Sequence, residues 1–234
     1  MEKKYVMLMD DSLSISFEYG GVWHTLYRIK ALRDFGDVNK GDVGGYIESE
    51  KNLSHEGNCW VYDEAGVFDN AKVFDNARVF DNARVFDNAR VFDNARVFDN
   101  AGVYGDARVY GDARVYNNAR VFDNAGVYGD ARVFGDAGVY GDARVFGGAK
   151  VYGLVMVYGD AEVKGAEDYI IFKNWWSSGR YFTWTRSNNM WRVGCFYGTG
   201  EELIKKAYKD SERSGREYER IVKYVEEILR DERE

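Results

Sequence analysis

Two histidines, His24 and His55, are the side chains of this sequence best suited to acid–base chemistry near neutral pH. His24 follows Trp23 in a stretch that alternates like a strand, and His55 lies just before a long repetitive region. Neither lies beside an insertion that could form a catalytic loop. We therefore expect neither histidine to be a catalytic residue.

A second group of chemistry-bearing residues lies near the end of the chain, where tryptophans and arginines gather. Such residues can stack on the base of a nucleotide, or they can form a core with charged flanks. Because this short region needs a core of its own, we expect most of the rings to be packing. The candidate site consists of Trp175, Trp176, Arg180, Trp184, Arg186, Trp191 and Arg192.

A hexapeptide recurs without interruption from Val61 to Val163, and this repeat must determine the fold of the central part of the chain. Valine fills the first slot of every repeat, and alanine fills the fifth with Val155 as the exception. Asp-Asn or Gly-Asp fills the third and fourth slots in most copies. A period of six keeps side chains on one face of a strand but not of a helix. We predict one short strand per repeat, with valine and alanine inward, followed by a corner.

This pattern resembles the hexapeptide repeat of the bacterial transferases, which form left-handed parallel β-helices. The resemblance implies three strands per coil, so that residues eighteen apart stack. We therefore predict a mainly β fold, with an N-terminal β cap over 1–45, a β-helix over 46–166 and a C-terminal α+β domain over 167–234. Transferases of this type use a histidine as general base, and His55 is the candidate for that role if the chain is an acyltransferase.

The second slot departs from the transferase pattern because it is Phe or Tyr in nearly every copy. Stacking by eighteen gives three outward columns of rings, each beside a column of slot-six residues. Beside the first ring column, slot six alternates as Gly66, Arg84, Gly102, Arg120 and Gly138. Beside the third it is uniformly basic, so we take that face as the candidate binding surface. Its residues are Phe80, Phe98, Tyr116, Phe134 and Tyr152 with Arg78, Arg96, Arg114 and Arg132.

Two interpretations of these columns stay open. The rings and guanidinium groups can cover one another and so stabilise the prism. Alternatively, continuous aromatic stripes exceed what monomeric proteins usually expose, so that at least one face meets a partner or a second copy of the chain. Both can hold on different faces.

Most corners carry a single carboxylate, and we expect these short polar side chains to cap corner amides. A calcium ladder would need six to eight oxygens around each ion. We therefore expect no metal site and no cofactor.

The sequence at the two ends differs from the repeat, as caps of a solenoid should. Before the repeat, Gly20 and Gly21 predict a turn between two strands, and we place Ile47, Leu53 and Cys59 in the alanine column of an irregular first coil. After it, we predict two strands and a returning strand, followed by two helices. The helix starts that we predict are Thr199 with Glu202 and Ser214 with Glu217.

The net charge of −7 leaves no basic segment, which argues against general binding to nucleic acid. No apolar stretch is long enough for a secretory or membrane segment, so we expect a cytoplasmic protein that does not bind membranes.

The whole arrangement is similar to uncharacterised hexapeptide-repeat proteins of phages and prophages, through the stretches GGYIES, GNCWVYDEA, VYGDA and GCFYGTGEEL. Our leading hypothesis is a non-enzymatic, phage-encoded protein that binds a host protein or complex, as an inhibitor of a host system for example, and forms homo-oligomers. The alternatives are an acyltransferase, a self-assembling structural protein, and an oligomer that sequesters a small nucleotide.

Overall fold

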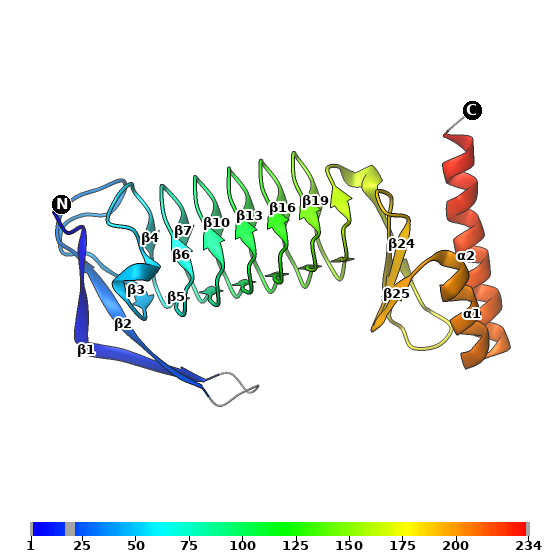
Figure 1. The fold of residues 1–234 in the computed structure, drawn as a ribbon, viewed down its shortest axis with the longest axis horizontal. Helices are drawn as coiled ribbons and strands as arrows, with labels where there is room; N and C mark the ends of the chain where they lie inside the picture. Colours follow the sequence, from blue (N-terminus) through cyan, green and yellow to red (C-terminus); the bar gives the residue numbers. More distant parts are fainter. Residues whose placement is uncertain (1, 17–21, 233–234) are drawn as a thin grey trace.

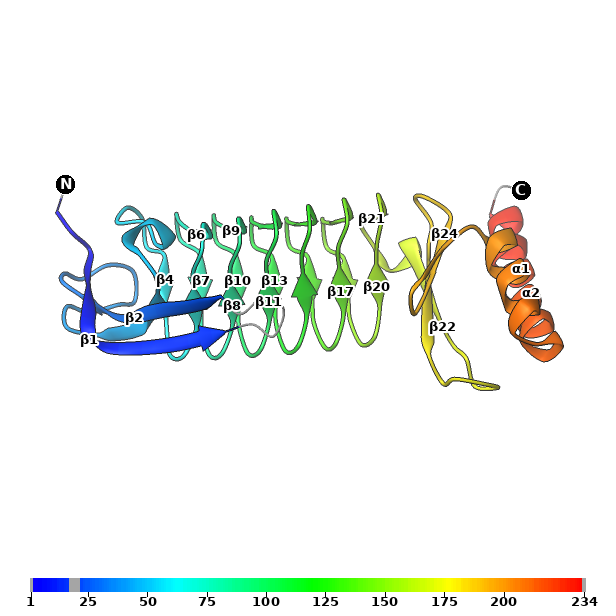
Figure 2. The same ribbon diagram turned by 60° about the horizontal axis from the view of Figure 1, so that its bottom comes forward.

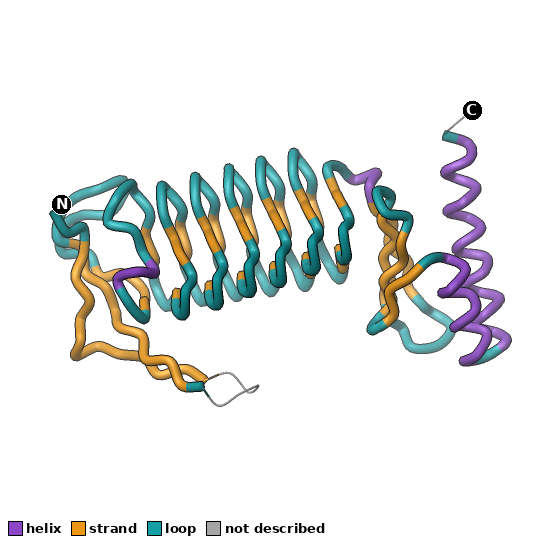
Figure 3. Tube along the Cα trace, viewed as in Figure 1, coloured by secondary structure: helices purple, strands orange, loops and turns teal. Residues whose placement is uncertain are grey.

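The centre of the molecule is a solenoid in which short strands follow one another around a three-sided prism (Figure 1). The structure is a computed structural model that describes residues 2–16 and 22–232. Each turn of the solenoid alternates two-residue strands with corners (Figure 3). Strands eighteen residues apart pair in parallel, so each of the three faces is a parallel sheet. The fold predicted from the period of six is confirmed.

We number the three faces as the ring columns above, so that the first face carries the first ring column. The first face contains β5 (Gly66–Val67), β8 (Arg84–Val85), β11 (Gly102–Val103), β14 (Arg120–Val121), β17 (Gly138–Val139) and β20 (Met156–Val157). The second contains β6 (Lys72–Val73), β9 (Arg90–Val91), β12 (Arg108–Val109), β15 (Gly126–Val127), β18 (Arg144–Val145) and β21 (Glu162–Val163). The third contains β4 (Trp60–Val61), β7 (Arg78–Val79), β10 (Arg96–Val97), β13 (Arg114–Val115), β16 (Arg132–Val133) and β19 (Lys150–Val151).

Valine and alanine fill the inside of the prism. Every slot-one valine from Val61 to Val163 and every slot-five alanine is at most 1% exposed, and Val155 takes the place of an alanine at 0%. Backbone hydrogen bonds join consecutive turns, as where the Arg96 amide donates to the Ala113 carbonyl at 2.9 Å. The small side chains allow three sheets to meet around one narrow core, and backbone pairing along the axis satisfies the polar groups.

The corners are held by a left-handed backbone at the third slot. Asp in this slot has φ of 51–57°, as at Asp63 and Asp75, and Gly in this slot has φ of 62–72°. Where the slot holds Asp, its carboxylate accepts the amide hydrogen of the residue eighteen positions later, as Asp93 does from Gly111 at 3.0 Å. The prediction that corner carboxylates cap corner amides is therefore confirmed for the aspartates of the third slot.

An antiparallel hairpin opens the chain and continues the first face. Strand β1 (Tyr5–Ser16) pairs with β2 (Trp23–Ala31), β2 pairs with β3 (Val43–Ile47), and β3 pairs in parallel with β5. The hairpin leaves the prism at an angle (Figure 1) and runs beside the first turns (Figure 2). The predicted turn at Gly20 and Gly21 lies outside the described residues.

The register predicted for the first coil is wrong by two residues. Ile47 pairs with Val67 and Leu53 with Val73, twenty positions apart, so both lie in the valine column rather than the alanine column. The helical turn η1 (Glu50–Asn52) lies between them. Two additional residues after Leu53 restore the spacing of eighteen before β4, and Cys59 lies in the buried alanine column as predicted.

The C-terminal region is a sheet covered by two helices. The antiparallel order is β22 (Tyr169–Lys173), β23 (Tyr181–Thr185), β24 (Met190–Val193) and β25 (Phe196–Gly198), after the short η2 (Ala166–Asp168). Helices α1 (Gly200–Asp210) and α2 (Glu212–Asp231) pack on the side away from the solenoid (Figure 1). Thr199 and Glu202 form the predicted capping box. The start predicted for α2 at Ser214 is wrong by three residues, because its N-cap is Ser211, whose hydroxyl accepts the Ser214 amide hydrogen. Neither helix of the described chain is long and apolar enough to cross a membrane.

Candidate binding groove along the first face

Three recesses join into one groove along the first face. The widest, of about 790 Å³, lies between the hairpin and the first face, and shares Tyr104 and Arg120 with a recess of about 330 Å³. That recess shares Tyr140, Met156 and Arg192 with a third, of about 360 Å³, at the C-terminal sheet. We call this row of adjoining recesses the groove. It runs from the N-terminal hairpin to the C-terminal sheet.

Glycine in the sixth slot opens the groove at its centre. A Cβ atom added at Gly102 would meet only the ring of Tyr104, at 3.6 Å, so the space over this residue is open. Over Gly66 the space is filled by Arg84, whose Cδ lies 3.3 Å from the same position, and over Gly138 it is filled by Met156. The alternation of glycine and arginine noted in the sequence therefore produces one deep position, at Gly102.

A column of rings forms one wall of the groove. Phe86, Tyr104, Phe122 and Tyr140 stack with centroids 4.6–5.0 Å apart and planes within 4–9° of parallel. This separation is the spacing of neighbouring strands, so the repeat itself sets the stacking. Because the rings cover one another's faces, their electropositive edges and the tyrosine hydroxyls face the groove.

Four arginines line the groove, and none of them pairs with a carboxylate within 4.0 Å in the described part of the chain. They are Arg84, Arg120, Arg180 and Arg192. Arg84 donates to the Glu64 carbonyl at 2.6 Å, and burial lowers the pKa of its guanidinium, an effect that the charge of Glu64 opposes. Acidic corners at Asp69, Asp87 and Asp136 also reach the lining, so the groove is mixed in charge.

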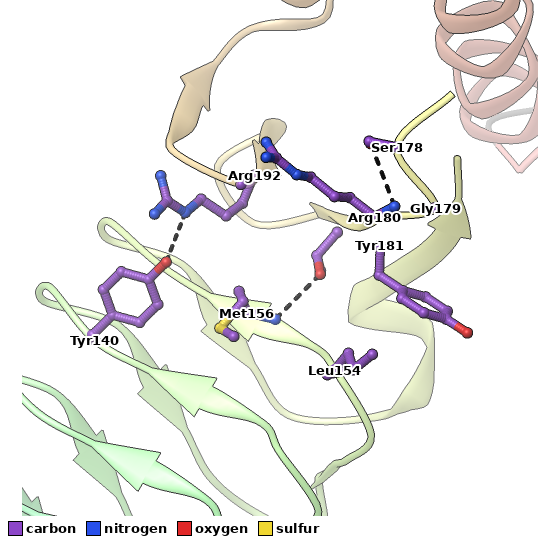
Figure 4. Close-up of a pocket in the computed structure, with 10 residues that line it drawn as sticks. Tyr140, Leu154, Met156, Ser178, Gly179, Arg180, Tyr181 and Arg192 are labelled. Atoms are coloured by element: carbon purple, nitrogen blue, oxygen red, sulfur yellow. Dashed lines mark hydrogen bonds between the residues drawn. The ribbon is translucent and has the colours of Figure 1, made fainter. Parts of the chain in front are cut away.

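The C-terminal end of the groove lies where the sheet docks on the solenoid (Figure 4). Arg192 donates from Nε to the Tyr140 hydroxyl at 2.7 Å, and its guanidinium lies over the rings of Tyr140 and Tyr158. The Met156 amide donates to the Thr183 hydroxyl at 3.2 Å. Leu154 and Arg180 line the remaining sides of the recess.

The third-face candidates do share one face, as predicted. Their rings stack with centroids 4.7–5.2 Å apart, and Arg78 pairs with Asp37 at 2.9 Å. Tyr152, at the end of the column, is 50% exposed. The rings thus cover one another along the column, and the role of this face in binding stays a prediction. The set consists of Phe80, Phe98, Tyr116, Phe134 and Tyr152 with Arg78, Arg96, Arg114 and Arg132.

The C-terminal set does not form a single platform. Trp176, Trp184 and Trp191 are 9%, 1% and 2% exposed and pack in the core under the helices. Trp175 is 70% exposed, with the guanidinium of Arg213 over its ring.

The arginines of that set have separate roles. Arg186 pairs with Glu232, and the hydrogen bond to that carboxylate, together with its charge, raises the pKa of the guanidinium; Arg186 also donates to the Glu167 carbonyl. Arg180 and Arg192 reach the groove, which the sequence did not indicate.

His55 lies in the irregular first coil, away from the groove. Its ring stacks on Tyr5 with centroids 4.3 Å apart, its Nδ1 accepts the Lys4 amide hydrogen at 3.2 Å, and burial lowers its pKa. His24, in contrast, lines the groove and faces Glu48, with Nδ1 and Oε1 3.0 Å apart. Glu48 follows Ile47 and so takes the second slot, which holds a ring in later turns. The wrong register predicted for the first coil concealed this position of Glu48.

Comparison with known proteins identifies the repeats. A family described as YdcK beta solenoid repeat matches residues 89–105, 113–129 and 125–141. The chain is also 39% identical over 64 residues to the uncharacterised acetyltransferase YdcK of Escherichia coli K12. This alignment covers 26% of the chain and 19% of the relative, so the chain matches about a fifth of that protein. The central turns, within residues 89–141, are therefore similar to the YdcK β-solenoid repeat.

Proposed function

We propose that this chain is a binding protein that holds an extended acidic segment of a partner protein in the groove. The observation that carries this proposal is the open position at Gly102 between Arg84 and Arg120, two groove-lining cations without a carboxylate partner among the described residues. Charge-assisted hydrogen bonds from guanidinium to carboxylate are among the stronger polar contacts in proteins.

The dimensions of the groove fit an extended peptide. Arg84 and Arg120 are two turns apart, a separation of about 9.6 Å at ~4.8 Å per turn. An extended chain in the polyproline II conformation advances about 3.1 Å per residue with three residues per turn, so every third side chain would face an arginine. The five turns between the levels of Asp69 and Met156 span about 24 Å, which accommodates about seven residues.

The wall of ring edges favours a peptide over a nucleic acid or a nucleotide. Single-stranded nucleic acids bind through bases stacked on exposed aromatic faces, and here the faces are covered by neighbouring rings. The net charge of −7 also opposes a polyanion with a charge on every unit. A segment with spaced carboxylates needs no open ring face and carries fewer charges for the net charge of −7 to repel.

The partner would be a host protein if the chain is phage-encoded, as its resemblance to phage and prophage proteins implies. Covering an acidic segment of that protein would block whatever else binds there, which is one route to inhibition of a host system. Homo-oligomerisation stays a prediction, and light scattering of the purified chain tests it.

The test is the affinity of a fluorescein-labelled peptide with glutamate at every third position, measured by fluorescence anisotropy. Gly102→Met fills the deep position with the side chain that Met156 already places in the same column. Gly126→Met is the matched control, because Gly126 on the second face likewise has only a ring near its Cβ position, at 3.7 Å. We expect Gly102→Met to weaken binding at least about tenfold, equivalent to about 1.4 kcal/mol, and Gly126→Met to leave it unchanged. Equal affinity of the two variants, or of the glutamine analogue of the peptide, contradicts the proposal.

A second candidate function is acyl transfer, favoured by the match to YdcK and by the pair of His24 and Glu48 at the groove wall. Glu48 would orient the imidazole of His24 as general base on an acceptor held in the groove. Release of free CoA from acetyl-CoA, measured across a panel of amines and sugars, tests this candidate. Activity lost in His24→Ala and kept in His55→Ala supports it, and activity insensitive to His24→Ala contradicts it.

A further inference from the structure

We propose that His24, Glu48 and Asp69 form a binding site for a divalent transition-metal ion, with Zn²⁺ as the expected ion. Their three ligand atoms lie within 4.8 Å of one another at the hairpin end of the groove. The inference does not depend on the peptide proposed for the groove, but it gives His24 and Glu48 a different role from the acid–base pair of the second candidate function.

Neighbouring strands of one sheet bring the three side chains together. His24 is on β2, Glu48 directly follows β3, and Asp69 lies two residues after the end of β5, and these strands are consecutive in the first sheet. The His24 ring packs on Phe68, with centroids 5.1 Å apart, and only 12% of its side chain is exposed. The imidazole is thus held in place by packing, before any ion binds.

The backbone occupies one oxygen of each carboxylate and leaves the other facing His24. Glu48 Oε2 accepts the Asp69 amide hydrogen at 2.7 Å, and Asp69 Oδ2 accepts the Asp87 amide hydrogen at 3.4 Å. The remaining oxygens, Glu48 Oε1 and Asp69 Oδ1, lie 3.0 and 3.6 Å from His24 Nδ1. Backbone hydrogen bonds of this kind commonly orient carboxylates that bind metals.

Two carboxylate oxygens therefore converge on one ring nitrogen. A proton on Nδ1 can bond well with only one of them, and the second carboxylate charge is left facing the same point. A divalent cation in place of the proton binds both oxygens and the nitrogen and neutralises both charges.

The ligand types indicate the class of ion. One imidazole nitrogen with two carboxylate oxygens suits zinc and its neighbours in the transition series, whereas calcium and magnesium prefer oxygen alone. Zinc ligands lie about 2.0–2.2 Å from the ion, so ligand atoms about 3–4 Å apart can share it. His24 and Asp69 both line the widest recess of the groove. The fourth ligand position would therefore open onto the groove, as in zinc sites that bind water or a substrate.

From the sequence we expected no metal site, and this proposal departs from that expectation. The three residues are separated by 24 and 21 positions and follow no short ligand motif. Their convergence depends on the twenty-residue register between β3 and β5 and on the path of the hairpin.

The test is isothermal titration of the metal-free full chain with ZnCl₂. Glu48→Gln keeps an oxygen for the Asp69 amide and removes the charge, and His24→Ala removes the nitrogen. His55→Ala is the matched control, since His55 lies near Glu50 but away from the groove. We expect one zinc per chain, at least tenfold weaker binding in Glu48→Gln and His24→Ala, and wild-type affinity in His55→Ala. Circular dichroism of the metal-free variants shows whether they fold.

Cobalt substitution gives a second, spectroscopic readout. Co²⁺ bound to the chain should show visible absorption bands that disappear in Glu48→Gln. A wild-type chain that takes up no zinc, or folded variants that bind it as well as the wild type, would overturn the proposal.

Discussion

Arg192 of the C-terminal sheet donates a 2.7 Å hydrogen bond from Nε to the hydroxyl of Tyr140 in the solenoid. Its guanidinium also lies 5.6 Å from the centre of the Tyr140 ring and 5.2 Å from that of Tyr158. One side chain therefore joins the two parts of the molecule and closes the end of the groove. The solenoid and the C-terminal sheet are coupled through the aromatic column of the first face.

Removing the Tyr140 hydroxyl should loosen this junction. Tyr140→Phe keeps the ring in the column and removes the acceptor of a charged donor, which should destabilise the docked state by about 1.5–3 kcal/mol. Urea denaturation followed by tryptophan fluorescence measures the loss. Tyr116→Phe is the matched control, because the Tyr116 hydroxyl has no hydrogen-bond partner among the described residues. Equal midpoints for the two variants would show that the Arg192 contact contributes nothing.

The stacked columns should contribute to stability through ring contacts along the whole prism. Phe98 stacks between Phe80 and Tyr116, with centroids 4.7 and 4.8 Å away. Phe98→Ala removes both contacts and a half-buried side chain, so we expect a loss of about 2–3 kcal/mol in the free energy of unfolding. Phe98→Tyr should change it by less than about 0.5 kcal/mol, because tyrosine already occupies this column. A small effect of Phe98→Ala in chemical denaturation would argue that the columns are not structural.

The corners allow backbone conformation and hydrogen bonding to be separated. Asp93 has φ of 55°, and its carboxylate accepts the amide hydrogen of Gly111. Asp93→Gly loses the carboxylate but suits the left-handed backbone, whereas Asp93→Ala loses the carboxylate and adds strain of about 1 kcal/mol. We expect the alanine variant to have the lower melting temperature. The opposite order would mean that the left-handed backbone at this corner is not what favours Asp and Gly.

Stability should fall at alkaline pH because of Tyr169. Its hydroxyl donates to the Lys150 carbonyl, and burial, followed by the nearby Tyr152, raises its pKa from 10.0 to about 12. The folded chain then holds a proton that the unfolded chain releases above pH 10, so this contribution to stability is full below pH 10 and is lost as pH rises toward 12. Free energies of unfolding measured from pH 9 to 12 should fall less steeply in Tyr169→Phe. Parallel curves for the two proteins would contradict this assignment.

The repeat could be predicted in detail because valine and alanine mark every turn of the prism. The period of six set the inward and outward slots, and stacking by eighteen followed from the family resemblance. The first coil lacks those landmarks, so the two additional residues after Leu53 could not be recognised, and Ile47 was assigned to the wrong column. The prediction therefore missed that Glu48 takes the place of a ring beside Asp69.

The groove on the first face was not predicted, and the sequence indicated the third face as the binding surface instead. The alternation of glycine and arginine beside the first ring column was visible in the sequence. Whether this alternation produces a groove depends on two long-range placements, those of the hairpin that carries His24 and of the sheet that carries Arg192. Likewise, composition could not separate Trp184 and Trp191, which are buried, from the exposed Trp175.

The most direct test of the central claim is to locate the bound acidic peptide on the surface of the chain. A glutamate-rich peptide carrying a benzophenone group can be cross-linked to the full chain, and the attached residues identified by mass spectrometry. The account predicts attachment at Tyr104 beside Gly102 and at Met156 further along the groove, and its loss in Gly102→Met. Attachment concentrated on Phe98 and Phe134 of the third face, unchanged in Gly102→Met, would contradict it.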